Sequence, residues 1–216
     1  MKNIPEFTET IEEWIHFFIP LADGTKLAAR AWLPVNAIEQ PVPAILEYIP
    51  YRKRDGTAIR DEQMHPYWAA FGYACVRVDI RGSGESDGLL LDEYLQQELD
   101  DAVEVINWLE HQDWCSGKVG MMGKSWGGFN CLQVAALRPS ALKAIITVCS
   151  TDDRYADDCH YRGGAVLIEN FSWASTISGF MAKPPDPLLL PETWRENWLE
   201  RLQNMPFFAK NWLEHT

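Results

Sequence analysis

One short segment constrains the fold of this chain more than any other. Residues 123–128 read GKSWGG, so Ser125 stands between glycines in a G-x-S-x-G pattern. Small and apolar residues at 119–122 precede it as in a buried strand, and a mostly apolar run at 128–137 follows as in a buried helix. A sharp turn from strand to helix leaves no room for bulky neighbours and lifts the serine hydroxyl above the sheet. The pattern therefore predicts a nucleophile elbow. The alternative interpretation is a glycine-rich turn that joins a strand to a helix and has no catalytic role.

The same pattern occurs a second time, around Ser86, where residues 84–88 read GESDG. Three leucines and an acidic helix start follow this second match, in place of an immediate helix of small residues. The pattern alone therefore decides nothing, and its context favours Ser125 as the nucleophile.

A polar, glycine-rich loop with the sequence DIRGSG at 79–84 follows a predicted strand and suggests a nucleotide-binding turn. The dinucleotide fingerprint would need a third glycine at position 87, which is Asp87, and a helix that opens at once. Neither is present. We therefore expect a structural loop in which Asp79 and Arg81 form an ion pair.

Composition restricts the classes of partner. The 216 residues are 47% hydrophobic and include ten tryptophans, which is enough for a substantial core. The net charge of −12 argues against a nucleic-acid partner. The N-terminus is polar and the apolar run at 14–20 is far shorter than a membrane span, so we expect a cytoplasmic protein without a membrane partner. No spacing of histidines and carboxylates is typical of a metal site, and we expect no metal or other cofactor.

The five cysteines are odd in number and show no C-x-x-C spacing. Cys75 and Cys149 fall in predicted buried strands and Cys131 falls in a predicted helix. We therefore expect reduced thiols that pack as small apolar residues.

Strands and helices alternate along most of the chain. A hairpin is expected around Asp23 and Gly24, and from residue 42 onward the strands alternate with helices, which predicts a parallel sheet with helices on its faces. After residue 150 this alternation stops, and a helical stretch at 192–202 lies in a segment rich in Trp, Asp and Pro. We expect an α/β core over 1–150 and a helical cap over 151–216. The expected strands are 14–19, 26–33, 42–48, 73–79, 119–122 and 144–149, and the expected helices of the core are 61–71, 91–111 and 128–137.

A serine nucleophile needs a histidine base and an acid that orients this base. On a nucleophile-elbow fold the chain order is serine, acid, histidine, which leaves His160 and His215 of the five histidines. His160 falls among the expected cap residues and His215 is the penultimate residue, so neither fits the role well. The carboxylates of residues 152, 153, 157 and 158 cluster after the last predicted strand, where a parallel sheet binds ligands. They would attract a positively charged substrate group, or form a solvated acidic loop.

Three segments together resemble the CocE/NonD hydrolases, a group of acyl esterases and X-Pro dipeptidyl-peptidases with an α/β-hydrolase core. They read PYRKRD at 50–55, VDIRGSGESDG at 78–88 and GKSWGG at 123–128. The opening hairpin, the DRY sequence at 153–155 and the two glycines at 163–164 also fit. The resemblance covers the whole chain and implies the N-terminal part of an α/β-hydrolase sheet, through the strand after the nucleophile helix, with the start of a helical cap.

The resemblance also implies roles for particular residues. Ser125 would be the nucleophile and would form a covalent acyl-enzyme. The backbone N–H of Trp126 and the phenolic hydroxyl of Tyr51 would form the oxyanion hole, where donors stabilise charge that develops in the transition state. A loop aromatic without chemistry is the alternative for Tyr51. Asp157, Asp158 and His160 are the candidate substrate-binding residues.

Members of this family are longer, and their acid and histidine lie in the later part of the chain. We therefore expect a truncated or split chain with an exposed sheet edge and uncovered apolar surface. The leading hypothesis is a serine hydrolase of small-molecule acyl esters or X-Pro dipeptides. The alternative is a chain without activity by itself, because the triad Asp and His lie beyond Thr216, and a compact hydrolase that uses His160 or His215 is a third option. The partners would be a second chain, the missing C-terminal part, or another copy in a homo-oligomer.

Overall fold

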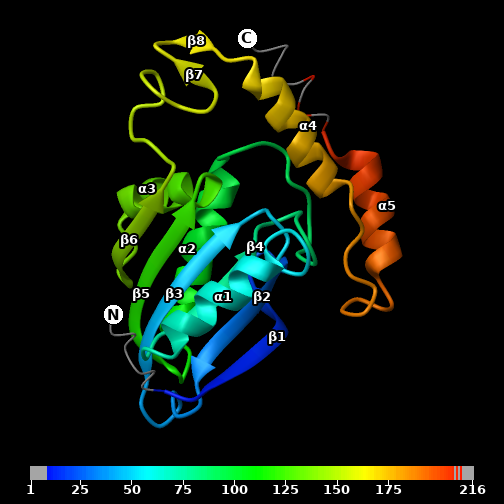
Figure 1. Ribbon diagram of the computed structural model, residues 1–216. Helices are drawn as coiled ribbons and strands as arrows, with labels where there is room; N and C mark the ends of the chain where they lie inside the picture. Colours follow the sequence, from blue (N-terminus) through cyan, green and yellow to red (C-terminus); the bar gives the residue numbers. More distant parts are fainter. Residues whose placement is uncertain (1–8, 207, 209, 211–216) are drawn as a thin grey trace, which may run out of the picture.

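A mixed sheet of six strands, in the order β1-β2-β4-β3-β5-β6, forms the centre of the protein (Figure 1). The computed structural model describes residues 9–206, 208 and 210. The strands of this sheet are β1 (Ile11–Pro20), β2 (Lys26–Pro34), β3 (Val42–Ile49), β4 (Ala74–Asp79), β5 (Cys115–Lys124) and β6 (Leu142–Val148). The helices that pack on it are α1 (Ala58–Ala69), α2 (Gln96–Glu110) and α3 (Trp126–Leu137).

The pairing of the strands confirms the predicted topology. β1 and β2 form the antiparallel hairpin expected around Asp23 and Gly24. β3, β4, β5 and β6 run parallel to one another, as the alternation of strands and helices predicts. Helix α1 covers one face over β2 and β4, while α2 and α3 cover the other face (Figure 1).

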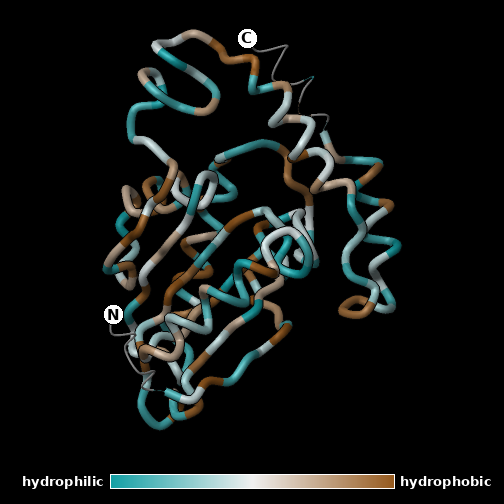
Figure 2. The backbone as a smooth tube through the Cα atoms, viewed as in Figure 1, coloured by the Kyte–Doolittle hydropathy of each residue, from teal (hydrophilic) through white to brown (hydrophobic). Residues whose placement is uncertain are grey.

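Burial of apolar side chains holds these layers together. All six residues of β4 are buried, as expected for a strand covered on both faces. On α2, the buried apolar residues Ala102, Val105, Ile106 and Leu109 form a stripe at helical spacing. Hydrophobic residues concentrate along the strands of the sheet (Figure 2).

The start of α2 differs from the prediction. The periodic leucines predict a helix from residue 91, but α2 begins at Gln96. Tyr94 has a φ of 58°, a left-handed conformation that an α-helix does not tolerate, and its N–H donates to the Glu98 carboxylate at 2.9 Å. A side-chain cap therefore replaces the first turn that the pattern suggested.

The expected ion pair between Asp79 and Arg81 is wrong. Asp79, the last residue of β4, is buried and pairs with Arg77 at 3.1 Å, whereas Arg81 leaves the sheet and pairs with Asp101 at 2.8 Å and Asp23 at 2.9 Å. The glycine-rich loop then folds back over Asp79: a Cβ on Gly84 would lie 2.1 Å from the Asp79 Oδ2 atom. The loop is structural, as expected, and its glycine at position 84 is required because the loop packs directly against the Asp79 carboxylate.

Ser86, the competing serine, has a structural environment. It is fully buried, its Oγ donates to the backbone oxygen of Asp79 at 2.6 Å, and it accepts the N–H of Ala28 at 2.8 Å. Its hydroxyl therefore serves to join the loop to β2.

The described part of the cap packs at the end of the sheet to which the parallel strands point (Figure 1). It contains β7 (Tyr161–Arg162), β8 (Ala165–Val166), α4 (Glu169–Met181) and α5 (Trp194–Asn204), and α5 matches the helix expected at 192–202. Arg201 of α5 is buried and donates to the backbone oxygen of Gly84 at 2.7 Å and to that of Ser86. The division of the chain at residue 150 stays a prediction.

Among the described residues, one edge of the sheet and the part of one face that α1 does not cover are open, as expected. β6 is an edge strand, and its Ile146 and Val148 side chains are 55% and 48% exposed. A mostly apolar depression of about 290 Å³, which Ile45, Met122 and Ile146 help to line, extends over β3, β5 and β6.

The five cysteines are free thiols. Cys75 and Cys131 are buried as predicted, but the placement of Cys149 inside a buried strand is wrong. β6 ends at Val148 on the open edge of the sheet, so Cys149 lies exposed just after it. Among the described residues, none of the helices is both long and apolar enough to span a lipid bilayer.

A buried ion pair next to the site gives a test of the fold. Lys53 Nζ and Glu85 Oε2 lie 2.6 Å apart with both side chains fully buried. Glu85→Gln leaves the lysine charge without its partner in a medium of low dielectric, so we expect the free energy of unfolding to fall by about 3–5 kcal/mol. Urea denaturation followed by tryptophan fluorescence measures this loss.

Glu62→Gln is the matched control, because Glu62 pairs with Arg30 at 3.4 Å and is 60% exposed. The Glu62 carboxylate is solvated, and Arg30 keeps Glu13 as a closer partner at 2.5 Å, so we expect the loss of this pair to cost less than about 1 kcal/mol. Equal losses for the two variants would contradict the importance of the Lys53–Glu85 pair.

Candidate active site

Ser125 lies in the turn between β5 and α3, with φ 56° and ψ −119°. A positive φ is rare for a residue with a side chain and costs about 1–3 kcal/mol. The neighbouring glycines make the turn possible, because a Cβ on Gly123 would lie 2.2 Å from the carbonyl carbon of Gly127. A Cβ on Gly128 would likewise lie 2.6 Å from the Ser150 Oγ atom. The backbone thus has the geometry of a nucleophile elbow.

Tyr51 reaches the elbow from the loop that follows β3. Its hydroxyl is hydrogen-bonded to the Ser125 side chain and to the backbone of Trp126. Burial raises the pKa of Tyr51 to about 12, although these two hydrogen bonds oppose the rise. The phenol therefore keeps its proton at neutral pH and remains able to donate it. The structure brings together Ser125, Tyr51 and Trp126, and their roles stay predictions.

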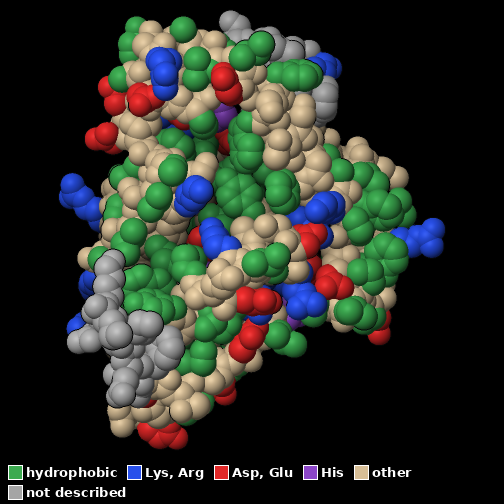
Figure 3. Space-filling view, viewed as in Figure 1, with side chains coloured by type: hydrophobic (Ala, Val, Ile, Leu, Met, Phe, Trp, Pro, Cys, Tyr) green, Lys and Arg blue, Asp and Glu red, His purple; other side chains and the backbone are tan. Residues whose placement is uncertain are grey.

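Aromatic residues of the cap form a wall beside this group. The Trp173 ring of α4 lies 6.2 Å from the Tyr51 ring and 6.4 Å from the Trp126 ring, and the Phe180 ring lies 6.1 Å from Tyr51. Hydrophobic side chains line the hollow between cap and core (Figure 3). Sequence reasoning did not single out Trp173; the signal was the abundance of tryptophan after residue 150.

Glu93 connects the cap to the core, and sequence reasoning missed it as well. Its carboxylate, 7% exposed, lies 2.7 Å from His160 Nε2 and accepts the indole N–H of Trp173. Burial disfavours a charge on His160, but hydrogen bonds with Cys159, Glu93 and Asn170 raise the pKa of its imidazole to about 11. An imidazole that is protonated at neutral pH does not accept a proton, so His160 does not fit the role of the base.

Two of the four acidic residues in the cluster at 152–158, Asp157 and Asp158, form ion pairs. Asp158 is buried, and its carboxylate lies 3.3 Å from the Arg154 guanidinium, which in turn lies over the rings of Tyr94 and Phe129 at 4.2 and 4.0 Å. Asp157 is exposed and pairs with Arg162 at 3.2 Å. The loop is thereby fixed against the core beside the elbow.

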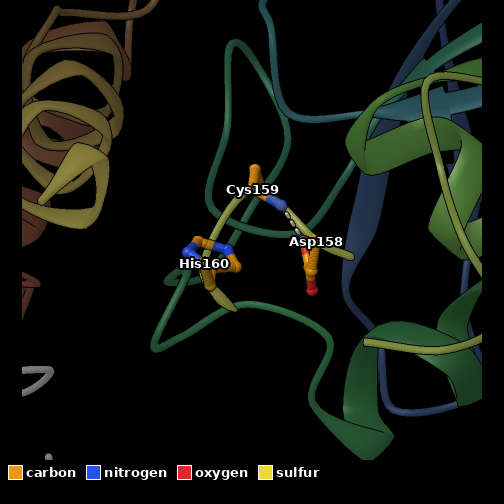
Figure 4. A group of neighbouring side chains, drawn as sticks. All are labelled: Asp158, Cys159 and His160. Carbon is orange, nitrogen blue, oxygen red and sulfur yellow. Dashed lines mark hydrogen bonds between the residues drawn. The ribbon is translucent and has the colours of Figure 1, made fainter. Parts of the chain in front are cut away.

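Two groups of described residues bring metal-binding atom types within 4.8 Å of one another. Asp158, Cys159 and His160 are consecutive on the cap loop (Figure 4), but Arg154 and Glu93 already engage the first and last of them. The second group, Glu47, Asp61 and His65, is buried against Arg60 and Arg77. Cationic partners on these carboxylates leave neither group suited to a metal ion.

The remaining histidines are distributed away from the elbow. His16 lies on β1, His65 lies in α1 with its ring stacked on Trp32, and His111 follows the last turn of α2. His215 lies outside the described residues. The described part of the chain therefore brings together the serine and the candidate oxyanion donors, and these three histidines lie on other elements than β5 and α3, which flank the serine.

A family model and individual relatives all relate this chain to esterases and X-Pro dipeptidyl-peptidases. A family model described as "X-Pro dipeptidyl-peptidase (S15 family)" matches residues 23–216. Cocaine esterase from Rhodococcus sp. is 33% identical over 163 residues, which are 74% of this chain and 27% of that protein. A putative Xaa-Pro dipeptidyl-peptidase from Streptomyces avermitilis is 31% identical over 119 residues, 48% of this chain and 17% of that protein. The chain thus spans about a quarter or less of these relatives.

Solved structures confirm the predicted fold. A CocE/NonD family hydrolase from Staphylococcus aureus superimposes with a TM-score of 0.69 at 21% identity, over 94% of this chain and 36% of that one. An α-amino acid ester hydrolase gives a TM-score of 0.59 at 25% identity, over 80% of this chain and 31% of that one. The sheet is that of an α/β-hydrolase N-terminal portion.

The left-handed backbone of Ser125 predicts a difference between two variants that both lack the hydroxyl. Ser125→Gly removes the steric cost of a Cβ at φ 56°, whereas Ser125→Ala keeps it. We expect the free energy of unfolding of the glycine variant to exceed that of the alanine variant by about 1 kcal/mol. Urea denaturation measures this difference. An alanine variant at least as stable as the glycine variant would show that no strain is stored at this position.

Proposed function

Because the chain belongs to the X-Pro dipeptidyl-peptidase (S15) family, which includes CocE/NonD-type esterases, we propose that it carries the nucleophile and oxyanion hole of a serine hydrolase. The substrates are acyl esters or X-Pro dipeptides. The observation that carries the proposal is the convergence of the Tyr51 hydroxyl, the Ser125 side chain and the Trp126 backbone at a strained elbow.

In the proposed reaction, Ser125 Oγ bonds to the acyl carbon of the substrate and the carbonyl electron pair moves onto its oxygen. The Trp126 N–H and the Tyr51 O–H donate to this oxyanion and stabilise it. The serine proton passes to a base and then to the leaving alcohol or amine as the C–O or C–N bond breaks. Water then hydrolyses the covalent acyl-enzyme by the same steps and regenerates Ser125.

The surroundings of the elbow suit substrates with apolar acyl groups, with the cap loop beside the substrate. Trp173 and Phe180 present ring faces or edges within about 6 Å of Tyr51. The Glu93 carboxylate is close enough to Tyr51 to raise its pKa, and it also contacts His160, so the loop with Asp157, Asp158 and His160 lies near the site. Asp157, with its exposed carboxylate, is the candidate contact for a positively charged substrate group.

A second candidate is that this 216-residue chain has no hydrolase activity by itself. It is supported by the positions of His16, His65 and His111 away from the elbow, and by the protonated state of His160. In this case the acid and the base come from polypeptide outside these residues: a further segment, a second chain or another copy.

Covalent labelling tests the proposed nucleophile. Ser125 Oγ should bond to the phosphorus of a fluorophosphonate probe as the P–F bond breaks and fluoride leaves to solvent, and mass spectrometry should place the adduct on Ser125 and not on Ser86. Tyr51→Phe removes one oxyanion donor, and we expect the labelling rate to fall by about 100-fold or more. Tyr73→Phe, on an exposed tyrosine of the core, is the matched control with an unchanged rate.

The outcome that contradicts the proposal is labelling that survives in Ser125→Ala. Hydrolysis of a nitrophenyl ester separates the two candidates. Turnover by this chain well above that of Ser125→Ala rejects the second candidate, and turnover equal to it, with Ser125 still labelled, supports it.

A further inference from the structure

A buried carboxylate that the proposed reaction does not use lies directly behind the elbow. Glu98, in the first turn of α2, is 5% exposed. Its Oε1 accepts the indole N–H of Trp126 at 2.5 Å, and its Oε2 accepts the backbone N–H of Tyr94 at 2.9 Å. One side chain therefore joins the start of α3 to the loop before α2.

These contacts act on the residue that supplies the candidate oxyanion donor. Trp126 is fully buried at the first position of α3, and its ring packs 5.2 Å from that of Tyr94. With its indole tied to Glu98 and its ring packed in place, the orientation of its main chain is fixed as well. Asn130, one turn further along α3, also hydrogen-bonds Glu98.

We propose that Glu98 is a positioning residue of this site: its carboxylate holds the indole of Trp126 and thereby orients the backbone amide that faces Tyr51. This inference rests on the proposed role of that amide in the oxyanion hole. It assigns Glu98 no contact with substrate. A buried carboxylate is costly unless its oxygens are hydrogen-bonded, and here the N–H groups that satisfy it belong to the site that it orders.

The contacts suit the ionised form of Glu98. Both oxygens accept N–H groups, which a carboxylate does freely, whereas a carboxylic acid must point one O–H away from these donors. Burial raises the pKa of Glu98 to about 7, and the hydrogen bonds from Trp126, Asn130 and Tyr94 limit the rise. The carboxylate should therefore form, and its hold on Trp126 should tighten, as pH rises through about 7.

Other titratable groups lie around Glu98 on the neighbouring elements. Glu93, on the loop before α2, raises the pKa of Glu98. Burial raises the pKa of Tyr48 on β3, and the nearby charge of Glu98 adds to this rise. Asp101 and Arg81 form an ion pair beside the adjoining cavity of about 380 Å³, and Glu200 of α5 lines the same cavity. The hydrogen bond with Asp101 likewise raises the pKa of Arg81, so neither Tyr48 nor Arg81 changes its charge near pH 7.

Nuclear magnetic resonance of the 216-residue chain, labelled with ¹⁵N-tryptophan, tests the inference without requiring activity. Trp126→Phe identifies the Trp126 indole resonance. We expect its proton to resonate downfield of an ordinary indole and to shift with pH, with a midpoint near 7. Glu98→Gln should abolish this titration and move the backbone amide resonance of Trp126, while Glu110→Gln at the other end of α2 should change neither.

The labelling assay supplies an independent readout. Glu98→Gln should slow fluorophosphonate labelling of Ser125 by about tenfold, and Glu110→Gln should leave it unchanged. A Trp126 indole proton that resonates at the position of an ordinary indole in the parent chain overturns the inference, even if the glutamine variant does not fold, and so does a Trp126 amide resonance that Glu98→Gln leaves unchanged. A titrating indole with no labelling of Ser125 in any variant keeps the positioning contact and rejects the proposed function instead.

Discussion

The carboxylate of Asp79, at the end of the central strand β4, is the constraint on which the surroundings of the site depend. It accepts the backbone N–H of Lys53 at 3.0 Å and so fixes the loop that carries Tyr51, two residues earlier. It pairs with Arg77 and is covered by Gly84, whose backbone oxygen anchors Arg201 of the cap. One buried carboxylate thus organises the loop of Tyr51, the glycine-rich loop and the contact with α5, because leaving it without partners would cost several kcal/mol.

The cap is joined to the core by polar contacts that converge near the elbow. Glu93 lies in the loop before α2 and engages both His160 and Trp173, so the wall of the site and the cap loop share one anchor. Arg154 adds a second anchor by lying across Tyr94 and Phe129. Since Tyr94 also contacts Glu98 through its backbone, the cap, the loop and the elbow form one connected network.

The sequence allowed the elbow to be predicted because its determinants are local. A strand, a serine between glycines and a helix specify a turn with little help from elsewhere, and the parallel sheet follows from the alternation of elements. Glu93 and Glu98 could not be found in this way, since their partners lie 80 and 28 residues along the chain. The ion pair expected between Asp79 and Arg81 is wrong for a related reason: Asp79 pairs with its near neighbour Arg77 inside the sheet, whereas Arg81 pairs with the distant Asp23 and Asp101. The leucine pattern likewise placed the start of α2 too early, because it carries no information about the left-handed Tyr94.

The two candidate oxyanion donors come from the ends of different strands that are neighbours in the sheet. β3 and β5 pair in parallel with Leu46 opposite Met121, and each strand continues to a turn, one before Tyr51 and the other at Ser125. The distance between the two donors is therefore set by the backbone hydrogen bonds that pair β3 with β5, and not by side-chain packing. A slip of one residue between these strands would displace one donor by about 3.3 Å and reverse the faces of its side chains. The candidate oxyanion hole therefore depends on strand register: the helices and the cap can vary in sequence around it, but a shift of even one residue between these two strands would separate its donors.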